Sequence, residues 1–141
     1  MSSTVIMLLV VTSILWGVAP IFDKMALSSG ITPFQGTAVR NMIIAVILMI
    51  SALLTGKATS LFLISPRSLI FLAASGIVAG CLGVFTFYKA LQLSETSRIV
   101  PLAATYPLVT AILSIVFLKE TLTWERFLGT ILIIIGIWFV K

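Results

Sequence analysis

Residues 99–118 read IVPLAATYPLVTAILSIVFL, a stretch that carries no charged side chain. A helix needs about 20 mostly apolar residues to cross the hydrocarbon core of a bilayer. Inside lipid the backbone must satisfy its own hydrogen bonds, so a lone segment of this kind has to be helical. The stretch therefore predicts a membrane-spanning helix and an integral membrane protein.

Four further apolar segments flank this one, and charged residues separate them. They cover residues 4–22, 37–54, 69–88 and 124–140. The second and the last of these are short, but each lies within the range that can span a membrane. We therefore expect residues 1–141 to form one all-α domain, a polytopic bundle of five transmembrane helices with no room for a soluble domain.

The composition agrees with this reading. Hydrophobic residues make up 60% of the 141 positions and charged residues 9%, whereas soluble domains carry about 25% charged residues. A soluble enzyme, a disordered chain and a nucleic-acid-binding protein are thereby excluded. The single cysteine, Cys81, leaves no intrachain disulfide, and histidine is absent. We therefore expect no metal site.

Boundary residues between the segments predict where helices begin. Thr32-Pro33-Phe34-Gln35 fits a capping box with proline at the first helical position. Ser65-Pro66 offers a cap and a proline before the third segment, and Thr123 precedes the fifth, with Glu125 in its first turn. The first segment lacks the basic leader and the small-residue cleavage site of a signal peptide, so we expect it to be retained.

The basic residues divide almost evenly between the two sides of the predicted bundle. One side receives Lys57, Arg67, Lys119 and Arg126, and the other receives Lys24, Lys89, Arg98 and Lys141, with Arg40 if it reaches the surface. The positive-inside rule then gives no firm orientation. Two alternatives stay open. Either the balance is accidental, or the chain inserts both ways and forms an antiparallel homodimer, an arrangement related to the inverted repeats of transporters.

Polar residues within the first two segments are candidates for a substrate pathway. Trp16 lies on a polar stripe of the first segment that ends at Asp23, which we interpret as an interfacial residue rather than a pathway residue. Arg40 lies just inside the second segment, where a cation must be paired, solvated or extended to the headgroups. Arg40 could attract an anionic substrate, pair with Asp23, or simply reach the interface.

The third segment carries Gly76, Gly80 and Gly83 on one predicted helical face. Glycines at this spacing let helices approach closely, so we predict packing or dimer contacts there. Tyr88 ends the segment and is either an interfacial anchor or a pathway residue.

The fourth segment contains two prolines. Pro101 is expected in its first turn, and Pro107 in mid-helix predicts a kink that frees a backbone carbonyl. Tyr106 and Thr110 lie beside that kink. Broken helices are pointers to transporter sites, so we predict that Tyr106, Pro107 and Thr110 line a substrate pathway.

Several kinds of chemistry lack the residues they need. No carboxylate lies deep in a segment, which weakens a proton- or cation-exchange mechanism. No nucleophile–base arrangement exists, so we do not expect an enzyme. The sequence contains no phosphate-binding loop, so nothing in it indicates that ATP drives the protein.

The whole pattern resembles a known family. The runs Phe87-Tyr88-Lys89-Ala90-Leu91, Tyr106-Pro107-Leu108-Val109-Thr110 and Phe117-Leu118-Lys119-Glu120-Thr121, with Trp16-Gly17 and Arg40 before them, resemble an EamA domain of the drug/metabolite transporter superfamily. The chain looks like the single-domain, five-helix form.

This resemblance implies a multi-pass permease or exporter of small metabolites that needs no cofactor and functions as a homodimer. Our leading hypothesis is a secondary transporter that works by alternating access in the cell membrane. A homodimer is implied because one five-helix chain would supply half of a pathway. The alternative that we keep is a non-transporting membrane subunit that assembles with, or regulates, another membrane protein.

Overall fold

The computed structural model describes residues 2–121 and 123–139, and every regular element in that part of the chain is a helix. The all-α prediction is therefore confirmed. The described residues fall into two compact units, one within residues 1–93 and the other within residues 94–141. The helices are α1 Ser3–Ser28, α2 Pro33–Leu54, α3 Ala58–Leu61, α4 Pro66–Ser75, η1 Gly76–Gly83, α5 Val84–Leu93, α6 Thr96–Ala103, α7 Tyr106–Leu118 and α8 Trp124–Trp138.

Helix α1 is longer than the sequence predicts, since it continues past Phe22 to Ser28. Asp23 therefore lies inside a helix rather than at its edge. The chain turns at Ser29 and Gly30, where glycine adopts a φ of +92° that other residues rarely tolerate. The predicted capping box then starts α2, because the Thr32 and Gln35 side chains each bond the other residue's backbone.

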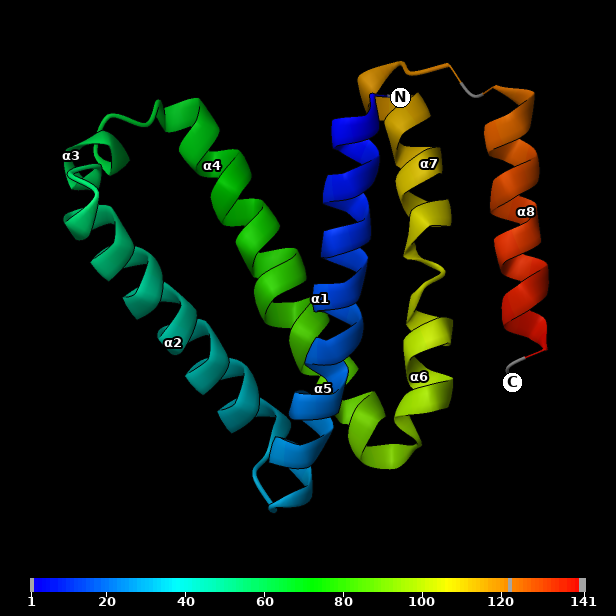
Figure 1. Ribbon diagram of the computed structural model, residues 1–141, viewed down its shortest axis with the longest axis horizontal. Coiled ribbons are helices and arrows are strands. Elements are labelled where there is room, and N and C mark those ends of the chain that lie inside the picture. Colours follow the sequence, from blue (N-terminus) through cyan, green and yellow to red (C-terminus); the bar gives the residue numbers. More distant parts are fainter. Residues whose placement is uncertain (1, 122, 140–141) are drawn as a thin grey trace. The chain divides into compact units, whose positions relative to one another are not determined.

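The third predicted segment is one rod made of α4, η1 and α5, and Figure 1 shows it in green. The Ser65 side chain caps it at Ser68 N–H, as predicted. Its middle is a π-helix, in which Val84 N–H donates to the Ala79 carbonyl five residues earlier. The predicted α-helical glycine face is wrong here, because a π-turn changes the angular spacing of the side chains.

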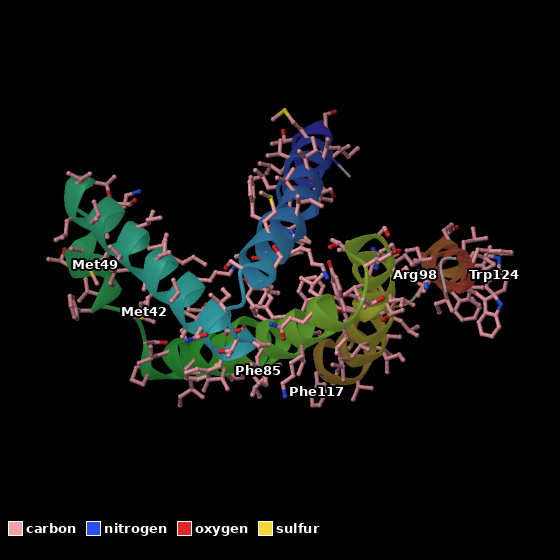
Figure 2. All side chains as sticks on the ribbon, turned by 90° about the horizontal axis from the view of Figure 1, so that it is seen from below. Met42, Met49, Phe85, Arg98, Phe117 and Trp124 are labelled. Carbon is pink, nitrogen blue, oxygen red and sulfur yellow. The ribbon has the colours of Figure 1, made fainter. Side chains whose placement is uncertain are left out.

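Within the first unit, α1, α2 and α5 converge near the turn between α1 and α2 (Figure 1). Leu27, Tyr88 and Leu91 are buried where they meet. Phe85 lies at the crossing of α2 and α5 (Figure 2). This apolar cluster anchors the end of the unit where the polar groups described below gather.

The fourth predicted segment is divided into α6 and α7 at Ala104 and Thr105, a break that is visible in Figure 1. The irregularity that the sequence predicts at Pro107 is therefore present, as a break between two helices rather than a bend within one. Pro107 lies in the first turn of α7, where its missing N–H costs little. Pro101 lies inside α6 rather than in its first turn, because α6 begins earlier than expected, at Thr96.

The last element, α8, begins after Thr123 with Glu125 in its first turn. The Thr123 side chain makes no capping hydrogen bond to the α8 backbone, so that part of the prediction is wrong. The predicted end at Val140 and the flanking Lys141 lie outside the described residues.

Among the described residues, four helical stretches are long and apolar enough to cross a membrane, namely 3–28, 33–54, 66–93 and 96–118. Helix α8 has 15 described residues, fewer than the roughly 17 that a span requires. Large apolar side chains project all around α1 and are exposed (Figure 2). Such exposure suits contact with lipid, and the predicted count of five spans is not confirmed.

Candidate functional site

A cavity of about 460 Å³ lies between α1, α2 and α5 in the first unit. Apolar side chains make up most of its wall, and four polar side chains join them. These polar residues are Asp23, Gln35, Arg40 and Tyr88. Polar and charged groups inside membrane segments are costly, and they commonly face a bundle interior or a pathway. The cavity is therefore the candidate substrate site of this unit.

The Tyr88 hydroxyl donates a hydrogen bond of 2.5 Å to Asp23 Oδ1. Tyr88 is 3% exposed and Asp23 is half-buried. A hydrogen bond to a carboxylate is stronger than one between neutral groups. This bond ties α5 to α1 and brings together two residues for which the sequence predicts no contact.

Gly36 makes room for the Tyr88 ring on α2. A Cβ atom at Gly36 would lie 2.9 Å from Tyr88 Cε2, closer than real Cβ contacts come. Glycine is therefore required in the first turn of α2 if the ring is to reach Asp23. The sequence gives no sign that Gly36 contacts Tyr88, except that a glycine stands one helical turn before Arg40.

Arg40 lies half-buried on the same wall of the cavity. Its positive charge acts on the Tyr88 hydroxyl, whose hydrogen bond goes to Asp23. In the described part of the chain Asp23 and Arg40 do not form a direct ion pair. The predicted pathway residues Arg40 and Tyr88 therefore line the same cavity as Asp23.

Two further hydrogen bonds brace this end of the unit. The Lys24 ammonium donates to the Leu91 carbonyl in the last turn of α5, where a cation also suits the helix dipole. Gln92 Nε2 donates to the Ile31 carbonyl at 3.0 Å. The first bond joins α5 to α1, and the second joins α5 to the α1–α2 connection.

A second cavity, of about 390 Å³, lies on the opposite face of α2. Phe34, Cys81 and Phe85 are among its apolar walls. Beside it, Asn41 Nδ2 donates to the Gly80 carbonyl in η1 at 2.9 Å and to the Thr37 carbonyl at 3.0 Å. Asn41 thus connects α2 to the π-helix.

The second unit has its own cavity of about 330 Å³, between α7, the α7–α8 connection and α8. Tyr106, Pro107 and Thr110 line it, together with Glu120 and Arg126. Tyr106 is 55% exposed, and Thr110 donates to the Tyr106 carbonyl of its own helix. The three predicted pathway residues of the fourth segment therefore share one cavity.

Trp16 lines none of these three cavities and is 65% exposed on α1. A Cβ atom at Gly76 would meet nothing within 4 Å, and one at Gly80 would meet only Asn41 Oδ1, at 3.9 Å. Gly83 faces the Val78 carbonyl of its own segment. Their predicted role in packing or dimer contacts stays a prediction.

The described residues contain no group of three or more His, Cys, Asp or Glu side chains that could hold a metal ion. The first cavity instead offers one carboxylate, one guanidinium, one phenol and one side-chain amide among apolar walls. Such a set recognises a polar or charged small molecule by hydrogen bonds and charge.

Residues 3–141 match the EamA-like transporter family. The chain belongs to this family. EamA proteins are members of the drug/metabolite transporter superfamily. Together with the apolar helices, membership makes this chain a multi-pass membrane protein of a transporter family.

Two relatives resemble this EamA chain. An uncharacterized protein of Methanocaldococcus jannaschii is 34% identical over 134 residues, which cover 95% of this chain and 93% of the relative. An uncharacterized transporter of Sinorhizobium sp. is 29% identical over 100 residues, 71% of this chain and 70% of that protein. No solved structure matches.

Proposed function

We propose that this protein is a secondary transporter that moves small metabolites or drugs across the cell membrane by alternating access. Membership of the EamA-like transporter family supports the class, and a relative is named as a transporter. The observation that carries the proposal for this chain is the cavity in which Tyr88 bonds Asp23 and interacts with Arg40.

The physical argument rests on what such a cluster costs. A charged group at the centre of a membrane helix is unfavourable by about 3 kcal/mol, and Asp23 and Arg40 lie nearer to helix ends, where the cost is smaller. The hydrogen bond from the Tyr88 hydroxyl to Asp23 and the positive charge of Arg40 on the same cavity wall offset part of that cost. A substrate with its own charged or polar groups would replace these contacts on entering. A substrate that enters the cavity could therefore take the place of the contacts among Asp23, Arg40 and Tyr88.

The working form in this proposal is a homodimer. Four candidate spans leave much apolar surface exposed, and the almost even division of basic residues suits insertion in both orientations. Tags at both termini test this arrangement. A mixture of orientations supports antiparallel pairing, and a single orientation in every copy would exclude it.

Reconstitution tests transport itself. Purified protein is placed in liposomes loaded with a metabolite extract, and mass spectrometry follows the solutes that leave. Arg40→Ala and Tyr106→Ala are compared with wild type, and Arg67→Ala, at the exposed start of α4, is the matched arginine control.

We expect wild type and Arg67→Ala to move the same solutes and Arg40→Ala to lose that flux. Purified protein that moves no solute favours the alternative, a membrane subunit that assembles with another protein. Unchanged flux in both Arg40→Ala and Tyr106→Ala would disprove the site assignment.

A further inference from the structure

The π-helix η1, Gly76–Gly83, interrupts a rod that is otherwise α-helical. π-helices are rare, are commonly limited to a single turn, and are frequent at functional sites. A segment of 8 residues in this form is long for its kind. An interaction from outside the segment can favour the π form over the more usual α form.

Asn41 supplies that interaction. Its Nδ2 donates to the Gly80 carbonyl, in the middle of η1, at 2.9 Å. A second bond from the same Nδ2, to the Thr37 carbonyl at 3.0 Å, orients the amide on α2. Side-chain amides that bond across helices stabilise helix pairs in membranes. Asn41 is therefore placed to stabilise the carbonyl arrangement of the π form.

The sequence of η1 also permits the π form. A Cβ atom at Gly83 would lie 3.1 Å from the Val78 carbonyl, five residues earlier. At Gly76, in the same segment, a Cβ atom would meet nothing within 4 Å. Alanine at Gly83 would therefore press on the carbonyl that the π-turn brings near, whereas alanine at Gly76 would not.

The register of η1 decides where Tyr88 points. If the segment became α-helical, everything after it would rotate relative to α4 by about 100°, the angle of one α-helical residue. Phe87 would then take the direction that Tyr88 now has. Phe87 has no hydroxyl, so the bond to Asp23 would be lost.

We propose that Asn41 is a positioning residue that acts through Gly80. By bonding the Gly80 carbonyl it holds η1 in the π form, and the π form holds Tyr88 on Asp23. Release of Asn41 lets η1 become α-helical and turns Tyr88 away from Asp23. The inference rests on the proposed function only in assigning this change to the transport cycle.

Fluorine NMR of the full chain in detergent reads the position of Tyr88 directly. The chain has two tyrosines, Tyr88 and Tyr106, so fluorotyrosine labelling gives two resonances, and Tyr88→Phe assigns them. In Asn41→Leu, which keeps the size of the side chain and loses the donor, the Tyr88 resonance should move toward its position in Asp23→Ala. The Tyr106 resonance should stay in place.

Two controls isolate the cause. Ser51→Ala removes a hydroxyl that bonds the Ile47 carbonyl of its own helix, and should leave the Tyr88 resonance unmoved. Asn41→Gln retains an amide and should restore part of the wild-type position. Gly83→Ala should reproduce the shift of Asn41→Leu, and Gly76→Ala should not, although the two substitutions are chemically the same.

A Tyr88 resonance that stays at its wild-type position in both Asn41→Leu and Gly83→Ala overturns the inference. Flux from proteoliposomes then separates positioning from transport. A fall of about tenfold in Asn41→Leu, with partial recovery in Asn41→Gln, supports the assignment to the transport cycle. If the Tyr88 resonance shifts in Asn41→Leu but flux is unchanged in both Asn41→Leu and Tyr88→Phe, Asn41 still positions Tyr88. In that case the Tyr88 site plays no part in the proposed transport function.

Discussion

The two units of this protein use their polar side chains differently. In the first, Tyr88 bonds Asp23 across 65 positions of sequence, and Asn41 bonds Gly80 across 39. In the second, the hydroxyls of Thr110, Ser114 and Thr130 return to carbonyls three or four residues earlier in their own helices. A bond within one helix leaves tertiary positions unchanged, whereas a bond between helices determines them.

The irregular helices of the two units differ in the same way. The π-helix η1 is contacted from another helix by Asn41. The break between α6 and α7 lies next to Pro107, which has no backbone N–H to continue the helix from α6. We therefore expect substitutions between helices in the first unit to have larger effects than substitutions in the second.

The largest effect is expected from Gly36→Val. Its side chain would occupy space held by the Tyr88 ring, and overpacking of this kind costs roughly 1–3 kcal/mol. The midpoint of thermal unfolding in detergent should fall and flux should be lost. Gly17→Val on α1 is the control, because a Cβ atom at Gly17 meets nothing within 4 Å. Equal losses in both variants would show that the Tyr88 contact is not the cause.

The next effect is that of Tyr88→Phe, which removes one hydroxyl and keeps the ring. Hydrogen bonds to charged groups contribute about 1.5–3 kcal/mol, so flux should fall by about tenfold or more. A double-mutant cycle with Asp23→Asn measures the coupling between the two residues. If the effects of the two substitutions simply add, the bond between them does not contribute.

Pro107→Ala should have a local effect in the second unit. Alanine restores an N–H that can donate to the Ala103 carbonyl, so the helix can continue through Ala104 and Thr105. Hydrogen exchange at these two amides should slow several-fold. Mass spectrometry of overlapping peptides measures that exchange. Unchanged exchange at these amides would mean that contacts other than the missing N–H of Pro107 maintain the break. The second unit would then resemble the first, in which Asn41 contacts η1.

The smallest effect is expected from Glu95→Gln. Glu95 and Arg98 form an ion pair at 3.7 Å, and both side chains are largely exposed. Exposed pairs at this spacing contribute roughly 0–1 kcal/mol and are screened by salt. Thermal unfolding at low and high salt should therefore coincide with wild type. A clear loss of stability at low salt would show that the second unit depends on charge contacts as well.

Much of the local structure could be predicted from the sequence. The capping box at Thr32 and Gln35 and the cap at Ser65 were correct because each involves residues three positions apart. The grouping of Tyr106, Pro107 and Thr110 in one cavity also follows from neighbouring positions. Trp16 lies outside the cavities, since a polar stripe on one helix does not say which neighbour that helix meets.

By itself, the sequence determined a helical membrane protein of the EamA family, because apolar length and local caps are properties of short segments. Only the tertiary structure decided that Asp23 meets Tyr88, that Gly36 admits the ring, and that Asn41 holds η1. These contacts join α1, α2 and the rod of η1 and α5, which are far apart in sequence. The geometry of these contacts depends on the register of the π-helix. That register is set when backbone hydrogen bonds shift by one residue, and a pattern of apolar residues does not reveal such a shift.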